Sequence, residues 1–126
     1  MKPDVSAAVS ILIVDDEAPI REILSQMFTQ SGFRVTEAPS ALQAFSVVDS
    51  DPPDLLISDL QLEDSDGLAM IAKIRAKLPA LPVILLTGIL FDEEVVRDSI
   101  SKLVTAYLPK TAPLSRVLGE VRRLTG

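Results

Sequence analysis

The chain of 126 residues contains no cysteine and no histidine. Without cysteine it has no disulfide framework, no thiol nucleophile and no zinc site built on thiolates. Without histidine it has no imidazole base, no imidazole metal ligand and no histidine to carry a phosphoryl group. Its chemistry therefore has to come from carboxylate, hydroxyl and amine groups.

Clusters of basic residues and long apolar runs are also missing. With 12 Lys and Arg against 18 Asp and Glu, the net charge is −6, so we expect no direct binding to nucleic acid, which draws on clustered Lys and Arg. The apolar stretch at 7–14 runs straight into two aspartates; it is too short for a membrane span and unlike a signal sequence. We therefore expect a cytoplasmic protein without membrane contact.

The composition predicts one folded domain. Apolar residues make up 48% of the chain and charged residues 24%, which argues against disorder, and a chain of this length can bury one core. Residues 1–9 carry no periodic pattern and are expected to form a loose tail before a domain at 10–126. Four short apolar runs in that domain are typical of buried parallel strands: 11–14, 55–57, 83–86 and 106–108.

Segments with helical spacing of apolar residues follow each of these runs and a fifth, alternating stretch at 33–37. Five strand and helix pairs in alternation predict an α/β protein, a flavodoxin-like, doubly wound parallel sheet of five strands in the order 2-1-3-4-5 with five helices. Gly32 is expected to end the first helix. The helix starts are marked by Pro19, Ser40 with Gln43, Asp66 with Gly67, Asp92, and Thr111 with Pro113.

Each buried run ends at or just before a reactive polar residue: Asp15 and Asp16, Asp59, Thr87, and Lys110. Because the carboxyl ends of parallel strands lie along one edge of a sheet, we expect these side chains to share one crevice. Carboxylates 4 Å apart repel by roughly 1 kcal/mol even in water. The cluster therefore needs a cation, and a hard, oxygen-binding ion such as Mg²⁺ is the natural one.

Most of these residues also have a purely structural explanation. Asp16 could cap the helix that follows, Thr87 could bond the backbone of a turn, and Lys110 could be a solvated surface charge. Asp15 and Asp59 have no helix beginning close enough after them to need a cap. The convergence of all five favours a functional site.

In this order, the residues resemble those of response-regulator receiver domains, the phosphate-accepting half of two-component signalling, over residues 10–124. The resemblance implies that Asp59 accepts a phosphoryl group by nucleophilic attack. It also implies that Asp15, Asp16 and Asp59 bind Mg²⁺, with the backbone carbonyl of Gln61 completing the metal shell.

The same resemblance implies a switch. Thr87 and Lys110 would bind the phosphoryl oxygens, and Tyr107, three residues before the lysine, would change rotamer. The surface around 92–103, 106–108 and the last helix would then change its partner binding.

The resemblance further implies partners. A histidine kinase or histidine phosphotransfer protein would supply the phosphoryl group, and a downstream protein target, an output domain or a second copy of the chain on the switching surface would respond. The chain would be a signalling switch rather than a metabolic enzyme. Two alternatives remain: a receiver fold kept as a phosphorylation-independent docking or dimerisation module, and a small aspartyl-phosphate phosphatase. The phosphatase is disfavoured because Leu60 and Gln61 follow Asp59 where a second aspartate is needed.

One position departs from the family pattern, since Thr111 stands where a proline is usually joined to the lysine by a cis bond. A cis bond before a residue other than proline costs about 2.5 to 4 kcal/mol. We therefore predict a trans bond between Lys110 and Thr111, with Lys110 still reaching the crevice through its flexible stem. Thr111 is then expected to cap the last helix.

Overall fold

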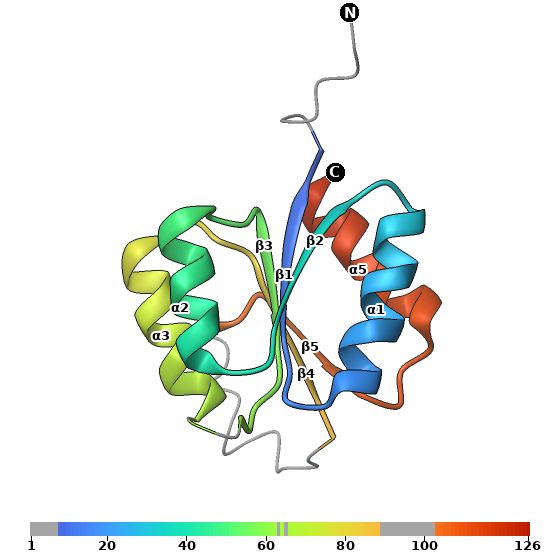
Figure 1. The fold of residues 1–126 in the computed structure, drawn as a ribbon. Helices are drawn as coiled ribbons and strands as arrows, with labels where there is room; N and C mark the ends of the chain where they lie inside the picture. The colour runs from blue at the N-terminus through green and yellow to red at the C-terminus, as the bar shows by residue number, and fades with distance from the viewer. Residues whose placement is uncertain (1–7, 63, 65, 89–102) are drawn as a thin grey trace, which may run out of the picture.

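A computed structural model describes residues 8–62, 64, 66–88 and 103–126 (Figure 1). Five parallel strands form one sheet in the order β2-β1-β3-β4-β5, which confirms the predicted α/β topology. The carboxyl ends of all five strands therefore lie along one edge of the sheet. The strands are β1 (Ser10–Val14), β2 (Arg34–Ala38), β3 (Leu55–Ser58), β4 (Val83–Thr87) and β5 (Ala106–Pro109).

Helices cover both faces of this sheet. The helices α2 and α3 lie on one face, and α1 and α5 lie on the other (Figure 1). The helix expected at 92–103 lies outside the described residues except for Leu103, its last residue, so the described part of the chain contains four of the five expected helices. The helices are α1 (Ala18–Gln30), α2 (Ala41–Ser50), α3 (Gly67–Lys77) and α5 (Leu114–Thr125).

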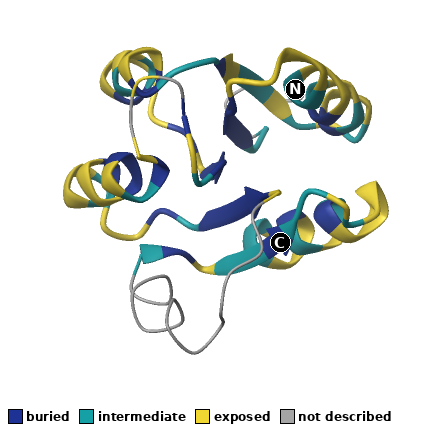
Figure 2. Cartoon of the chain, turned by 90° about the horizontal axis from the view of Figure 1, so that it is seen from below, coloured by how far each residue is buried: buried dark blue, intermediate teal, exposed yellow. Residues whose placement is uncertain are grey.

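The core consists of two apolar layers, one on each face of the sheet. In β1, Leu12 and Val14 pack toward α2 and α3, whereas Ile11 and Ile13 pack toward α1 and α5, because successive side chains of a strand point to opposite faces. All residues of β1, β3 and β4 are buried, as expected for central parallel strands. Figure 2 shows the buried sheet between helices whose outer faces are exposed.

Several predicted helix boundaries are correct. Gly32, with a φ of 94°, follows α1 in the left-handed region that glycine tolerates. The Ser40 side chain accepts a hydrogen bond from the Gln43 backbone N–H at 3.3 Å, and the Asp66 side chain accepts one from the Leu68 N–H at 2.8 Å. These caps hold the first turns of α2 and α3.

The cap predicted at Thr111 is wrong, and the capping role considered as a structural explanation for Asp16 is not found. Asp16 does not cap α1, because Glu17 occupies the cap position, and the Glu17 side chain makes no capping hydrogen bond. Thr111 does not cap α5, because Pro113 occupies the cap position and its carbonyl accepts from Arg116 and Val117. Proline disfavours a helical conformation in the residue before it, which moves the start of α5 beyond Pro113.

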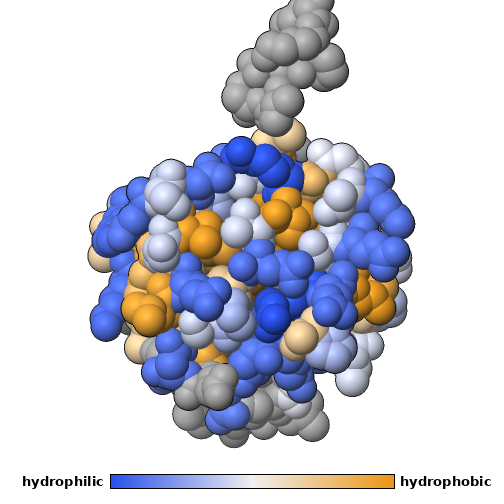
Figure 3. All heavy atoms as spheres, in the orientation of Figure 1, coloured by the Kyte–Doolittle hydropathy of each residue, from blue (hydrophilic) through white to orange (hydrophobic). Residues whose placement is uncertain are grey.

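The peptide bond between Lys110 and Thr111 is trans, as predicted, since none of the peptide bonds in the described ranges is cis. Among the same residues, no helix is both long enough and apolar enough to cross a membrane. On the face seen in Figure 3, apolar residues lie in separate patches among polar ones.

Candidate functional site

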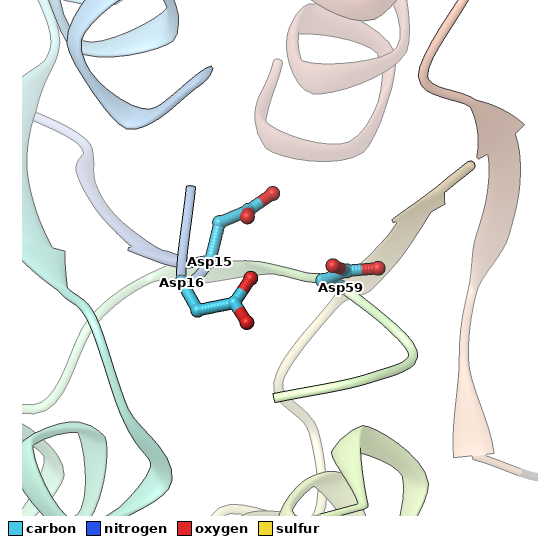
Figure 4. Close-up of side chains that lie close together, drawn as sticks. All are labelled: Asp15, Asp16 and Asp59. Atoms are coloured by element: carbon cyan, nitrogen blue, oxygen red, sulfur yellow. The ribbon is translucent and has the colours of Figure 1, made fainter. Parts of the chain in front are cut away.

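Three aspartates meet at the carboxyl edge of the sheet. Asp15 and Asp16 follow β1, and Asp59 follows β3, which pairs directly with β1. One carboxylate oxygen from each lies within 4.8 Å of the other two (Figure 4). Asp15 and Asp59 are buried, whereas Asp16 is exposed. The structure thus brings together the three carboxylates that the sequence assigned to one crevice.

Backbone hydrogen bonds continue past the strand ends and fix these aspartates. The Asp15 N–H donates to the Ala38 carbonyl at 3.2 Å, and the Asp59 N–H donates to the Val14 carbonyl at 3.1 Å. Each buried carboxylate also accepts a nearby backbone N–H: Asp15 Oδ1 from Glu17 at 2.9 Å and Asp59 Oδ1 from Leu60 at 2.7 Å. Both carboxylates are therefore held in place before any ligand arrives.

Lys110 lies directly against this cluster from the end of β5. Its Nζ is 3.0 Å from Asp15 Oδ2, 3.0 Å from Asp59 Oδ2 and 2.5 Å from Glu17 Oε2. Burial alone would lower the pKa of Lys110, but the hydrogen bonds to Glu17, Asp15 and Asp59 outweigh it and raise that pKa above its ordinary value. Lys110 is therefore a fixed positive charge among three acids.

The electrostatics of Asp15 differ from those of an exposed aspartate. Burial raises the pKa of its carboxyl, and the nearby Asp59 charge adds to this increase, while the Glu17 N–H and Lys110 act to lower it. The net result is an increase, because burial is the largest effect. A cation bound beside Asp15 would stabilise its ionised form.

A hollow of about 350 Å³ opens beside the cluster. Oxygen-rich, negatively charged surroundings of this kind fit Mg²⁺, a hard cation that prefers carboxylate, carbonyl and water ligands. The donor set is therefore compatible with the ion that the sequence suggested. The hollow is lined by Asp16, Glu17, Asp59, Gln61, Gly88 and Lys110.

Glu17 also belongs to the site, although it is not among the residues predicted from the sequence. Its side chain is the closest partner of Lys110, although it is largely exposed. The signal was its place directly after the acidic pair, in the turn that leads from β1 into α1. Without the fold, a third acid in that turn cannot be told from an ordinary residue near a helix start.

Thr87 and Tyr107 lie on neighbouring strands. Thr87 is the buried last residue of β4, and its backbone carbonyl accepts from the Lys110 N–H at 2.9 Å. Tyr107 is a half-buried residue of β5 that packs against the apolar layer under α2 and α3. Thr87 therefore helps to position Lys110 through its backbone, whatever its hydroxyl does.

Gly67 holds the loop after Asp59 close to the site. Its N–H donates to the Leu60 carbonyl at 2.7 Å, and a Cβ at this position would overlap the Asp59 carbonyl oxygen and lie 2.7 Å from that of Leu60. Only glycine allows so close an approach of backbone to backbone. The sequence marked Gly67 as a helix start, and the structure adds this second reason.

A model of the response regulator receiver domain matches residues 11–122, nearly the whole chain. The chain therefore belongs to the response regulator receiver domain family of two-component signalling, as the ordered residues of the site suggested.

Similar proteins agree with this assignment. The chain is 32% identical over 124 residues to the response regulator MprA of Mycobacterium bovis, an alignment that covers 93% of this chain and 50% of MprA. It thus spans about half the length of the MprA proteins it matches. A CheY-like receiver domain protein from Methanospirillum hungatei superimposes with a TM-score of 0.86 at 25% identity, covering 93% of both chains. The chemotaxis response regulator CheY4 of Vibrio cholerae, at 22% identity and a TM-score of 0.85 over 94% of this chain and 99% of its own, shares the fold.

Proposed function

We propose that this receiver domain accepts a phosphoryl group on Asp59 in an Mg²⁺-dependent reaction. The observation that carries the proposal is the position of the Asp59 carboxylate, which is buried, within 4.8 Å of two other carboxylates and 3.0 Å from the Lys110 ammonium. A simple ion pair would need only one carboxylate to balance the charge of Lys110. A buried cluster with an excess of carboxylates instead suggests a site that is completed by a further cation.

In this reaction a carboxylate oxygen of Asp59 attacks the phosphorus of a phosphohistidine on a partner protein. The new O–P bond forms as the P–N bond breaks, and the electron pair of the broken bond stays on the histidine nitrogen. No general base is needed, because a carboxylate nucleophile has no proton to lose as it attacks. Lys110 would then pair with the phosphoryl oxygens, and the Thr87 hydroxyl would bond one of them.

Asp15, Asp16 and Asp59 would hold Mg²⁺ together with the backbone carbonyl of Gln61, a residue that lines the same hollow. When bound, Mg²⁺ would neutralise negative charge on the transferred phosphoryl group. The side chains of this chain supply the attacking oxygen, the lysine and the hydroxyl. Their contribution is to hold the reacting groups in position.

The readout of the switch would be carried by β5 and α5. We propose that Tyr107 turns inward when Thr87 moves toward the phosphoryl group, changing the surface that β5, α5 and the segment 92–103 present to partners. A histidine kinase or histidine phosphotransfer protein would act as donor in the cytoplasm. A downstream target, an output domain beyond this chain or a second copy would respond, without direct contact to nucleic acid or membrane.

Intact-mass measurement after incubation with acetyl phosphate tests the proposal. Wild-type protein should gain one phosphoryl group that depends on Mg²⁺ and is removed by hydroxylamine, whereas Asp59→Asn should gain none. Asp49→Asn, a change at an exposed aspartate of α2, is the matched control and should behave like wild type. Wild-type protein that gains no phosphoryl group would contradict the proposal and favour a phosphorylation-independent docking module.

A further inference from the structure

Helix α2 is capped by a residue from a distant loop. The Asp64 carboxylate, between β3 and α3, accepts hydrogen bonds from the backbone N–H groups of Ala41 at 2.9 Å and Leu42 at 3.2 Å. These are the first two residues of α2, whose N–H groups have no partners within the helix. The two bonds hold the pKa of the Asp64 carboxyl below its ordinary value, so this cap is ionised at neutral pH. Asp64 thereby connects the loop between β3 and α3 to the start of α2, where Leu42 lies 22 residues earlier in the sequence.

The loop that carries Asp64 also forms one wall of the candidate site. At its base, Gln61 and Asp66 form an antiparallel bridge, and the Gly67 N–H donates to the Leu60 carbonyl. Gln61 lines the hollow beside Asp59. The loop is therefore closed at its base, just after β3, and fixed to α2 through Asp64.

The start of α2 is also connected to Asp15, one of the proposed metal ligands. Ala38 ends β2, two residues before the Ser40 cap of α2, and its carbonyl accepts from the Asp15 N–H. Contacts thus run from Asp15 through Ala38 to the start of α2, then through Asp64 and its loop back to Asp59. The two strand ends that supply the carboxylates are joined both by strand pairing and by this longer route.

We propose that Asp64 is a positioning residue for the metal site, acting by fixing the loop that presents Gln61 next to Asp59. The inference rests on the proposed function, because it concerns the Mg²⁺ that the site would hold. A loop that is tied down in the resting protein loses less conformational freedom when its carbonyl becomes a ligand. Removing the tie should therefore weaken metal binding even though Asp64 itself is not a ligand.

The coupling must also run in the opposite direction, because linkage between two binding events is reciprocal. Mg²⁺ at the aspartates should strengthen the hydrogen bonds that Asp64 accepts. The backbone amides of Ala41 and Leu42 should then exchange more slowly with solvent when Mg²⁺ is present.

Calorimetric titration with MgCl₂ separates positioning from simple helix capping. Asp64→Ala should raise the Kd for Mg²⁺ roughly tenfold, at the lower end of what the loss of residues supporting metal ligands costs. Asp64→Asn keeps one acceptor oxygen and should give an intermediate Kd. Ser40→Ala is the matched control, since it removes the other α2 cap without touching the loop, and its Kd should equal that of wild type.

The rate of backbone amide hydrogen exchange, measured with and without Mg²⁺ in the unphosphorylated protein, provides the second readout. In wild type, Mg²⁺ should slow exchange at Ala41 and Leu42, and this effect should disappear in Asp64→Ala. Equal Kd values in wild type, Asp64→Ala and Asp64→Asn would overturn the inference and leave Asp64 as a helix cap alone. Wild-type protein that binds no Mg²⁺ would instead overturn the proposed function, and this inference with it. If Asp64→Ala fails to fold, the comparison of Asp64→Asn with Ser40→Ala decides.

Discussion

Lys110 is the residue that balances the resting site. Its ammonium contacts carboxylates from Asp15, Glu17 and Asp59, and only 14% of its side chain is exposed. Without a metal ion, this single charge keeps two buried carboxylates from repelling each other unopposed. The stability of the metal-free protein should therefore depend on it.

We predict that Lys110→Ala lowers the free energy of unfolding by about 2 kcal/mol in EDTA, because it leaves buried carboxylates without their charged hydrogen-bond donor. Urea denaturation measures this loss. Lys77→Ala breaks an exposed ion pair with Asp49 and should cost less than about 1 kcal/mol. Mg²⁺ should restore part of the Lys110→Ala loss. A loss no larger than that of Lys77→Ala would contradict the prediction.

The raised pKa of Asp15 predicts a pH dependence of stability. The folded protein holds the Asp15 proton more tightly than the unfolded chain does, so this residue makes stability fall as pH rises from 3.8, its ordinary pKa, through the raised value. Asp15→Asn removes this contribution. Without metal, the free energy of unfolding of Asp15→Asn relative to wild type should therefore increase with pH across that window. Urea titrations at several pH values measure the difference, and a decrease would show that the sign is wrong.

Single residues also show what sequence can and cannot predict about the site. Asp15, Asp16, Asp59 and Lys110 could be assigned to one crevice because each stands at the end of a strand, and the strand order alone brings those ends together. The contact of Glu17 with Lys110 depends on the path of a turn, which strand order does not determine.

At the scale of elements, the path of the chain from Asp59 into α3 requires a residue without a side chain at Gly67. The adjoining carbonyls of Asp59 and Leu60 belong to the backbone and cannot rotate away. A methyl group at this position would displace the loop, the start of α3, or both.

We predict that Gly67→Ala lowers the free energy of unfolding by about 1 to 3 kcal/mol, the usual cost of forcing an atom into filled space. Phosphorylation of Asp59 should slow as well, since the change acts on the backbone of the acceptor. Gly119→Ala is the matched control. Gly119 lies in α5, where an added Cβ would have no described residue within 4 Å beyond the backbone of its own helix, so alanine should stabilise the helix by about 0.5 to 1 kcal/mol. Chemical denaturation measures both values, and equal signs would contradict the prediction.

Element boundaries could be predicted where one local signal dominates. Ser40 with Gln43 and Asp66 before Gly67 gave correct starts for α2 and α3, because each cap bonds a backbone group close in sequence. Thr111 failed because a stronger constraint, Pro113, lies two residues later. The capping role of Asp64 could not be predicted, since this loop residue bonds the start of α2, which is distant in sequence.

For the whole molecule, metal binding should appear as added stability. A ligand that binds only the folded state stabilises it by about 2.7 kcal/mol at a hundredfold excess over Kd. We predict that Mg²⁺ raises the melting temperature of unmodified protein and that replacing Asp15 and Asp16 with Ala abolishes the increase. Replacing Asp49 and Asp51, two exposed acids near the end of α2, should leave the increase intact. Equal increases in the two double variants would contradict a metal site at the end of β1.

The net charge of the hollow also favours binding of the cation before the phosphodonor. Asp15, Asp16, Glu17 and Asp59 with Lys110 carry a net charge of −3 when all are ionised, and the phosphodonor of the proposed reaction approaches as an anion. Before a divalent cation is bound, the site repels its own substrate, and dissolved salt should speed their encounter by screening that repulsion. Once the cation has reduced the charge, the barrier to approach falls. The same acids that make the site selective for a cation thus keep phosphodonors out until that cation is present.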